Sequence, residues 1–192
     1  MKTQREILKI KAVEQYIISQ LGGTVDFMKL FKLLYFAQQK KLVTVGHPLM
    51  EDGFRAVKLG PIPSFTYKCF DYQLKNESMS PEMQDFVSGF HLYEKDGIRY
   101  VECVEEPNMK MLAQIDVDYI NDILDKYGEM DAMRVSEESH KDQSWIEAFH
   151  RERGTKCKDI MSQEDIARAG GADNDVLVYI HENQLIKQAF AK

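Results

Sequence analysis

The sequence predicts a mainly α (α+β) fold: a compact helical domain with a buried central helix and a small antiparallel β-hairpin. Three observations carry this prediction. Several segments repeat apolar residues at steps of three or four, which is the period of an amphipathic helix. Residues 27–37 are apolar almost all round, as expected of a helix at the centre of a core. Two β-rich runs flank Asp96-Gly97, and an Asp-Gly pair in that position is a strong hairpin signal.

The first two helices follow from apolar spacing and from the residues at their ends. The stripe of the first helix consists of Ile7, Ile10, Val13, Ile17 and Leu21. Gly22-Gly23 ends this helix, because glycine adopts the left-handed conformation that closes a helix. Thr24 or Asp26 can cap the second helix, which we expect to run to about residue 43. Lysines beside its apolar segment are expected to cover the core edge with their stems while the ammonium groups reach water.

Glycine and proline divide the next part of the chain. Residues 46–49 end the second helix, and we interpret Gly60–Pro63 as a rigid turn in which the prolines restrict their neighbours. Between these breaks, Phe54–Val57 fits either a short strand or one helical turn. A helix is expected over Ser64–Leu74. Another begins at Ser80-Pro81, since proline suits the first turn of a helix.

The second half of the chain contains the hairpin and the remaining helices. The hairpin strands are predicted at 91–95 and 98–104. An apolar stripe over 115–127, ended by Gly128, predicts a long helix. The spacing of Ser162 and Asp165 fits a capping box. Further helices are expected at 131–138, 144–151 and 173–190.

Length and composition indicate one domain over residues 1–192, with a C-terminal helical extension at 159–192. The chain is 44% hydrophobic and 29% charged, which excludes a disordered or fibrous protein. Its longest nearly uncharged apolar run, residues 33–37, is too short to cross a bilayer, and the N-terminus leads into a charged helix. Three separated cysteines fit a reducing cytosol. We therefore expect a cytoplasmic protein without a membrane partner.

Charge is distributed unevenly along the chain. The net charge is −6, but residues 1–70 hold 11 Lys and Arg against 5 Asp and Glu, whereas residues 71–192 hold 14 against 26. An electrostatic patch for nucleic acid could be formed by Lys29, Lys32, Lys40, Lys41, Arg55, Lys58 and Lys68. A nucleic-acid-binding regulator of its own operon is thus an alternative function, although no recognition-helix or RNA-binding motif accompanies the patch. The same asymmetry suits an acidic protein partner.

Motifs for metal, nucleotide or cofactor binding are missing from the sequence. The five histidines form no HxxxH or HExxH pattern, and no phosphate-binding glycine loop is present. We therefore expect no metal and no cofactor. His140 with Cys69, Cys157 or an acidic residue could form a catalytic pair, so an uncharacterised enzyme is a third hypothesis. The simpler interpretation is that isolated cysteines are buried apolar residues and that Trp145 packs over His140.

Three stretches in a fixed order carry a resemblance to a known family. They are Lys29-Leu30-Phe31-Lys32-Leu33-Leu34-Tyr35-Phe36-Ala37, then Gly46-His47-Pro48-Leu49 with Ala56-Val57-Lys58-Leu59-Gly60-Pro61-Ile62-Pro63, and finally Ser139-His140 followed by Trp145. Together they resemble the SocA-like antitoxin family, whose shared module is the Panacea domain and whose members are often labelled phage-associated proteins. The resemblance covers about residues 5–150. Departures from the family pattern are Val57 in place of an aromatic residue and Ser139 in place of threonine, which keeps the hydroxyl.

The resemblance implies a small cytoplasmic antitoxin that neutralises a cognate protein toxin by direct complex formation. The toxin is usually encoded by the adjacent gene, and its presentation to a cellular protease is left open. The family is paired with unrelated toxins, so the resemblance does not identify the partner, and it implies no catalytic residues. The candidate partner-binding residues are Lys32, Arg55, Lys58, Gly60, Pro61, His140 and Trp145. If Lys32, Arg55 and Lys58 converge, they would form an anion-seeking face.

Overall fold

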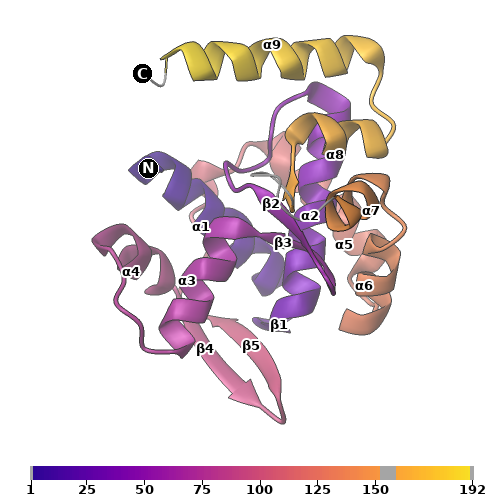
Figure 1. The fold of residues 1–192 in the computed structure, drawn as a ribbon. Coiled ribbons are helices and arrows are strands. Elements are labelled where there is room, and N and C mark those ends of the chain that lie inside the picture. The colour runs from indigo at the N-terminus through magenta and orange to yellow at the C-terminus, as the bar shows by residue number, and fades with distance from the viewer. Residues whose placement is uncertain (1, 152–158, 191–192) are drawn as a thin grey trace.

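Helix α2 (Phe27–Val45) runs through the middle of the molecule, and the other elements pack around it (Figure 1). The computed structural model describes residues 2–151 and 159–190. The side chain of Asp26 caps α2 by accepting a hydrogen bond from the backbone N–H of Lys29 at 2.9 Å. Gly46 ends the helix with a φ of 68°, in the left-handed region that favours glycine. The prediction of a buried central helix is therefore confirmed, with an end two residues beyond the expected one.

The other helices surround α2 and agree with the predicted segments. In the described residues they are α1 (Gln4–Gln20), α3 (Ser64–Leu74), α4 (Pro81–Val87), the 3-10 turn η1 (Met109–Met111), α5 (Gln114–Tyr127), α6 (Ala132–Ser139), α7 (Gln143–His150), α8 (Gln163–Ala169) and α9 (Asn174–Phe190). Caps recur at their starts, for example Ser80 before α4 and Ser162 before α8. Gly170 is the C-cap of α8.

Two small antiparallel sheets complete the fold. In the first, the order is β1 (Thr24–Asp26), β5 (Ile98–Cys103) and β4 (Phe90–Lys95). In the second, the order is β3 (Gly60–Pro63), β2 (Phe54–Val57) and β6 (Ile160–Met161). The predicted hairpin is β4–β5, and its two turn residues, Asp96 and Gly97, have φ values of 53° and 75°. Positive φ at both positions is what a tight Asp-Gly hairpin turn requires.

The interpretation of Gly60–Pro63 as a turn is wrong, because these residues form the edge strand β3. They pair antiparallel with β2, with Gly60 opposite Val57 and Pro63 opposite Phe54. A strand at the edge of a sheet donates N–H groups to its neighbour only from alternate residues. Pro61 and Pro63 occupy the alternate positions whose missing N–H groups the ladder does not need, so proline is compatible with this strand.

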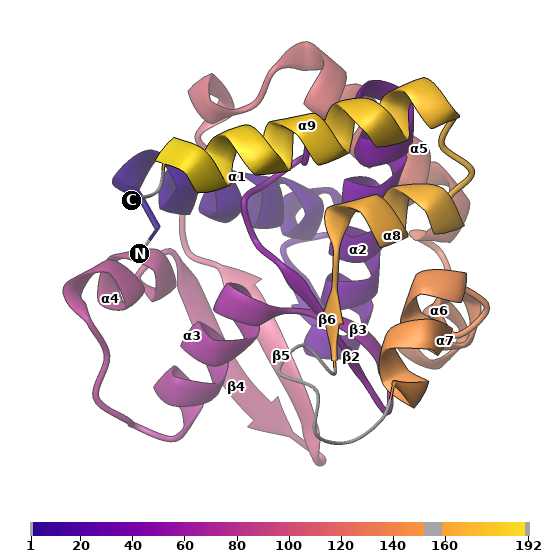
Figure 2. The same cartoon turned by 45° about the horizontal axis from the view of Figure 1, so that its top comes forward.

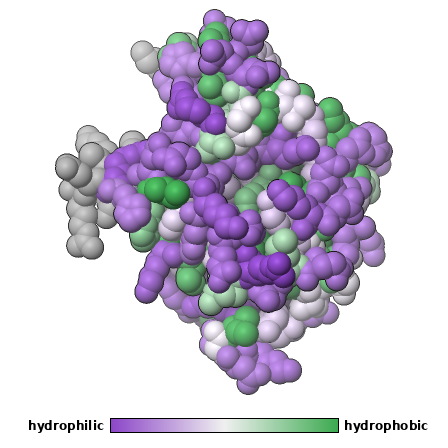
Figure 3. All heavy atoms as spheres, turned by 90° about the vertical axis from the view of Figure 1, so that its right-hand side faces the viewer, coloured by the Kyte–Doolittle hydropathy of each residue, from purple (hydrophilic) through white to green (hydrophobic). Residues whose placement is uncertain are grey.

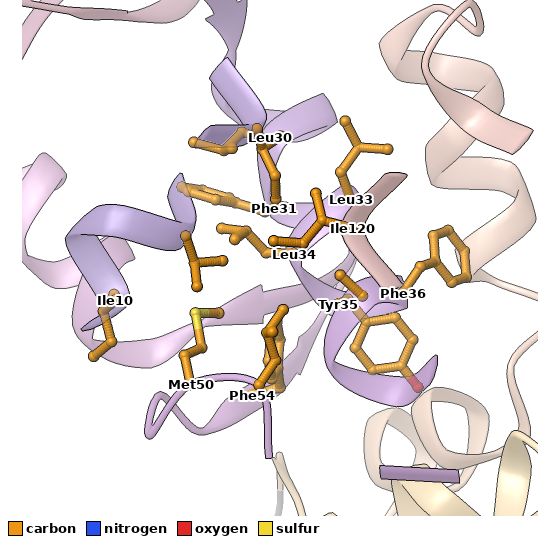
Figure 4. Packing of buried hydrophobic residues seen from close by; sticks show 14 of the residues in the cluster. Ile10, Leu30, Phe31, Leu33, Leu34, Tyr35, Phe36, Met50, Phe54 and Ile120 are labelled. Atoms are coloured by element: carbon orange, nitrogen blue, oxygen red, sulfur yellow. The ribbon is translucent and has the colours of Figure 1, made fainter. Parts of the chain in front are cut away.

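The core gathers along α2 and joins residues from distant parts of the chain. Figure 4 shows Leu33, Leu34 and Tyr35 of α2 close to Phe54 and Ile120, which come from β2 and α5. Tyr35 meets Phe54 edge to face, with ring centroids 5.4 Å apart. Close packing of this kind fixes where β2 lies against α2.

Two buried carboxyl groups connect α1, α3 and the loop before β2. Asp52 accepts hydrogen bonds from the backbone N–H groups of Phe65 and Thr66, at 2.8 and 3.0 Å, and so caps the start of α3. The Thr66 hydroxyl is shared between Asp52 and Glu14. Burial raises the pKa of Glu14 well above its ordinary value, which favours the neutral form of this carboxyl group inside the core.

The segment from residue 160 to 190 takes part in the same core. β6 adds a strand to β2, which the prediction of a purely helical extension missed. Ile166 of α8 and Ile180 of α9 are buried in the common hydrophobic cluster. α9 crosses over α8 and is tied to the body by an ion pair between Lys187 and Glu51 (Figure 1).

The side of the molecule that carries α6 and α7 is mostly hydrophilic, with hydrophobic residues scattered singly (Figure 3). Such scattered residues are normal on protein surfaces. Across residues 2–151 and 159–190, none of the helices combines the length and the apolar composition that a membrane span needs.

A candidate partner-binding groove beside the Gly-Pro hairpin

The β2–β3 hairpin is held by three side chains from three different helices. Figure 2 shows this hairpin between α3 on one side and α6 and α7 on the other. Trp145 of α7 donates its Nε1–H to the carbonyl of Val57 at 3.0 Å. The Ser136 hydroxyl of α6 donates to the carbonyl of Leu59 at 2.9 Å. Lys32 of α2 donates from Nζ to the carbonyl of Pro61 at 2.9 Å, so alternate carbonyls along the hairpin are fixed.

Gly60 lies where only glycine fits. Its φ is 95°, a conformation that residues with a side chain rarely adopt. A Cβ at this position would lie 2.4 Å from Oγ of Ser139 and 2.7 Å from Cε of Lys32. Ser139 is itself fixed, because its hydroxyl donates to the carbonyl of Ser136 at 2.7 Å. The close approach of the hairpin to α2 and α6 thus explains glycine here.

His140 and Trp145 form a stacked pair, which confirms that Trp145 packs over the imidazole. Their ring centroids lie 4.3 Å apart with an interplanar angle of 28°. Burial, and then the nearby charge of Lys32, lowers the pKa of His140. The Nε2 atom of His140 is buried and has no hydrogen-bond partner in the described part of the chain. Burial and Lys32 thus favour the neutral form of the ring, which packs against the indole and has a backbone hydrogen bond with Lys58.

The residues that the enzyme hypothesis pairs with His140 are differently placed. Cys69 is buried in the core, and burial raises the pKa of its thiol to about 12, which disfavours the nucleophilic thiolate. Cys157 lies outside the described residues. Within the described ranges, His, Cys, Asp and Glu do not gather in threes as a metal site would require.

A groove of about 770 Å³ opens on the other side of the hairpin, between α2, α3 and β5. Its lining is rich in aromatic and aliphatic side chains and in basic residues. The members are Phe27, Met28, Phe31, Lys32, Arg55, Val57, Lys58, Leu59, Ile62, Ser64, Tyr67, Lys68, Asp71, Tyr72, Arg99 and Asp159. A concave site with an apolar lining and a few polar groups is the usual form of a binding site.

The charges in this groove are only partly compensated. Arg55 pairs with Asp159, whose Oδ2 lies 2.8 Å from the Arg55 Nε, and Arg99 pairs with Asp71 at 3.1 Å. Lys58 and Lys68 form no ion pair with a carboxylate of the described residues. With Lys32 included, five basic residues face two acidic ones, so the lining carries a net charge of +3 when all are ionised.

The predicted residues therefore divide between the groove and the support behind it. Lys32, Arg55 and Lys58 all line the groove, which brings the three predicted cations together. Lys32 nevertheless is only 1% exposed, so the expectation that its ammonium reaches water is wrong. The strong hydrogen-bond acceptor Pro61 O replaces that water. Of the remaining predicted residues, Gly60 and Pro61 belong to the hairpin itself, and Trp145 holds the hairpin while His140 stacks on its indole.

Sequence reasoning missed Tyr67 and Arg99, which complete the groove. Tyr67 projects from α3 and is 38% exposed, and Arg99 projects from β5. The helix and the strand were both predicted, but neither contains a local pattern that shows which other element its outer face meets. Only the tertiary fold brings them beside Lys58.

The seven-residue basic patch expected for nucleic acid does not form. Lys29 donates to the carbonyl of Gly128 at 2.6 Å, and Lys41 pairs with Asp116 at 2.6 Å. Lys40 pairs with Asp122 at 3.2 Å. These three cations are used in contacts with α5 and its end, because α2 packs against α5 along that side. The other four basic residues line the groove together with Asp71 and Asp159; they are Lys32, Arg55, Lys58 and Lys68.

Burial of Lys32 predicts a pH dependence of stability. Burial lowers the pKa of Lys32 from 10.5 to about 7, so between these values the unfolded chain binds more protons than the folded one. Stability should therefore rise with pH in this interval, by about 1.4 kcal/mol per pH unit from this residue. We compare the wild-type protein with Lys32→Met by urea denaturation at pH 7, 8 and 9. The free energy of unfolding of the wild type should rise with pH relative to that of the variant. Parallel profiles of the two proteins would contradict the lowered pKa of Lys32.

The chain is similar in sequence to known antitoxins. A family described as "Antitoxin SocA-like, Panacea domain" matches residues 30–146, which is more than half of the chain and includes most of α2, the β2–β3 hairpin and Trp145. Antitoxin SocA of Caulobacter vibrioides (strain NA1000 / CB15N) is 36% identical over 69 residues, or 35% of this chain. That similarity spans 37% of the relative's length. No solved structure matches.

Proposed function

The chain belongs to the SocA-like antitoxin family that carries the Panacea domain, and from this premise we propose that it neutralises a cognate protein toxin by binding it directly. The match of the family to residues 30–146 is the observation that carries the proposal. The partner proposed is the product of the adjacent gene, in the cytoplasm. Presentation of the bound toxin to a protease is a further step that the experiment below can detect.

A preformed surface supports a binding role. The β2–β3 hairpin is tied to α2, α6 and α7 by Lys32, Ser136 and Trp145, so its exposed side needs little ordering when a partner binds. The groove beside it offers exposed apolar and basic side chains, the types on which binding energy usually concentrates. A stable complex would bury roughly 1,600 Å² in total, of which this groove would be one part.

Co-expression with the adjacent gene tests the proposal. We expect the neighbouring product alone to arrest growth, and co-expression of this chain to restore growth and to yield a copurifying complex. A harmless neighbour, together with no copurification, would contradict the antitoxin function of this chain.

Titration with purified proteins separates binding from the other two hypotheses. Direct neutralisation should reach completion at a fixed molar ratio, whereas an enzyme would inactivate the toxin at a small fraction of that ratio. A regulator would instead bind its own promoter, with an affinity that falls steeply as salt rises. Toxin that disappears from protease-competent cells but persists in protease-deficient cells would show that the complex is also degraded.

A further inference from the structure

We propose that the groove between α2, α3 and the β2–β3 hairpin receives a segment of the protein partner in which an acidic side chain lies beside an apolar one. The inference deepens the proposed function and rests on it, because the partner is taken to be the toxin. It assigns the binding face and the chemistry of the segment that fills it.

The acidic part of the inference follows from the uncompensated charges. Even without the buried Lys32, the lining holds four basic residues against two acidic ones, although the whole chain has a net charge of −6. Arg55 and Arg99 already have aspartate partners, which hold them in place at the edges. Lys58 at the hairpin tip and Lys68 on α3 are exposed and lack such partners in the described residues. A carboxylate arriving between them would complete the charge balance and be steered there.

The apolar part follows from large exposed side chains next to these lysines. Leu59 is 52% exposed at the hairpin tip, and Tyr67 is 38% exposed on α3. A second hollow of about 350 Å³ shares Phe27, Met28, Leu59 and Arg99 with the groove and continues it toward the β4–β5 hairpin. Covering such surface is the main source of binding free energy, and a tyrosine beside basic groups is a common centre of it.

A polypeptide fits this lining better than nucleic acid does. Asp71 and Asp159 lie among the basic residues, and their charges would oppose a continuous row of phosphates. The alternation of cations, anions and apolar groups matches a peptide, whose own side chains differ from one position to the next. Lys32 contributes only from the wall, since its ammonium is held by the carbonyl of Pro61.

The test compares two double charge reversals in the full-length protein. Lys58→Glu with Lys68→Glu changes the groove, whereas Lys110→Glu with Lys126→Glu makes the same change in charge elsewhere. The pairs are matched, because Lys68 and Lys126 each lie over a tyrosine ring and Lys58 and Lys110 have no ion pair in the described residues. Against the adjacent-gene product, we expect the groove pair to raise Kd about a hundredfold and the control pair to change it by about threefold at most.

Truncation of Tyr67 tests the apolar part. Tyr67→Ala should raise Kd about tenfold or more, whereas Leu185→Ala, on the exposed side of α9, should leave Kd unchanged. Circular dichroism and urea denaturation verify that each variant is folded. Equal Kd values for the groove and control variants would overturn the inference while leaving the proposed function intact.

Panning a random-peptide display library on the immobilised protein gives a readout that needs no toxin. We expect selected peptides to combine Asp or Glu with an apolar neighbour and to lose binding to the Lys58→Glu, Lys68→Glu protein. This result would support the groove as a peptide-binding site even if the adjacent-gene product does not bind. Failure of the groove inference can therefore be distinguished from failure of the proposed function. Selected peptides without acidic residues, or undiminished binding to the variant, would overturn the inference.

Two other occupants of the groove would give different results with the same variants. A random-sequence oligonucleotide that binds at low salt and is lost only with the groove pair would replace the peptide by nucleic acid. Dimers in sedimentation velocity that disappear only with the groove pair would make the occupant a second copy, whose residues 71–192 are acidic. Either result overturns the proposal of a toxin segment.

Discussion

Gly60→Ala should lower the free energy of unfolding by about 2–5 kcal/mol, because the new methyl group meets two obstacles at once. The backbone at residue 60 has a φ of 95°, which disfavours any side chain. The methyl carbon would also lie 2.4 Å from Oγ of Ser139 and 2.7 Å from Cε of Lys32. Neither atom moves freely, since the Ser139 hydroxyl and the Lys32 ammonium each hold a buried carbonyl. Urea denaturation monitored by circular dichroism measures the loss.

Gly97→Ala is the matched control for this substitution. Its φ is 75°, but a Cβ there meets nothing within 4 Å, so it incurs the backbone strain without the collision. Gly60→Ala should therefore be the more destabilising by about 1–3 kcal/mol. Adding Ser139→Ala removes one of the two colliding atoms, and a double-mutant cycle should show that the two substitutions are coupled. Equal losses at Gly60 and Gly97 would show that the hairpin is not pressed against α2 and α6.

Local patterns in the sequence accounted for the elements that are long or have a distinctive turn. The stripe from Ile7 to Leu21 and the apolar surface of α2 are periodic over many residues, and the Asp96-Gly97 turn sets the β4–β5 register by itself. β1 and β6 have three and two residues, too few to show alternation. Each becomes a strand only because a partner from a distant part of the chain lies beside it.

The site was predictable where a residue type has a narrow set of uses. Glycine and proline at residues 60–63 indicated a break in helical structure, although not the strand β3 that forms there. The charge excess in residues 1–70 indicated Arg55 and Lys58. The environment of Lys32 was not predictable, because its helical position allows either an ammonium in water or one bonded to a carbonyl. The choice depends on the carbonyl of Pro61, which reaches α2 only after β3 pairs with β2.

The family motifs meet at the β2–β3 hairpin. The late His140–Trp145 element and the Gly60-Pro61 element lie far apart in sequence, yet they meet on the same hairpin. They support the groove from behind instead of lining it, since neither His140 nor Trp145 is among the groove residues. We therefore expect substitutions in these motifs to affect the fold first and the partner second.

Trp145→Ala should be among the most destabilising single substitutions, with a loss of about 3–5 kcal/mol. The indole is 8% exposed, stacks with His140 and with Phe149, and donates to the carbonyl of Val57. Its removal leaves a cavity and takes one hydrogen-bond donor away from the carbonyl of Val57. Trp145→Phe keeps an aromatic ring but loses the N–H donor, so it should be milder, at about 1–3 kcal/mol. Urea denaturation orders the two variants.

Two further measurements test whether Trp145→Ala loses stability at the hairpin in particular or in the core in general. The indole covers the imidazole of His140, and burial lowers the pKa of that group, so Trp145→Ala should raise the pKa of His140 in an NMR titration. Amide exchange in residues 57–61 should also accelerate, because the carbonyl of Val57 is released. Phe149→Ala is the control, since it removes a ring that stacks with the indole but leaves the hydrogen bond to Val57 intact. If both variants changed hairpin exchange equally, the Trp145 hydrogen bond would not be what holds the hairpin.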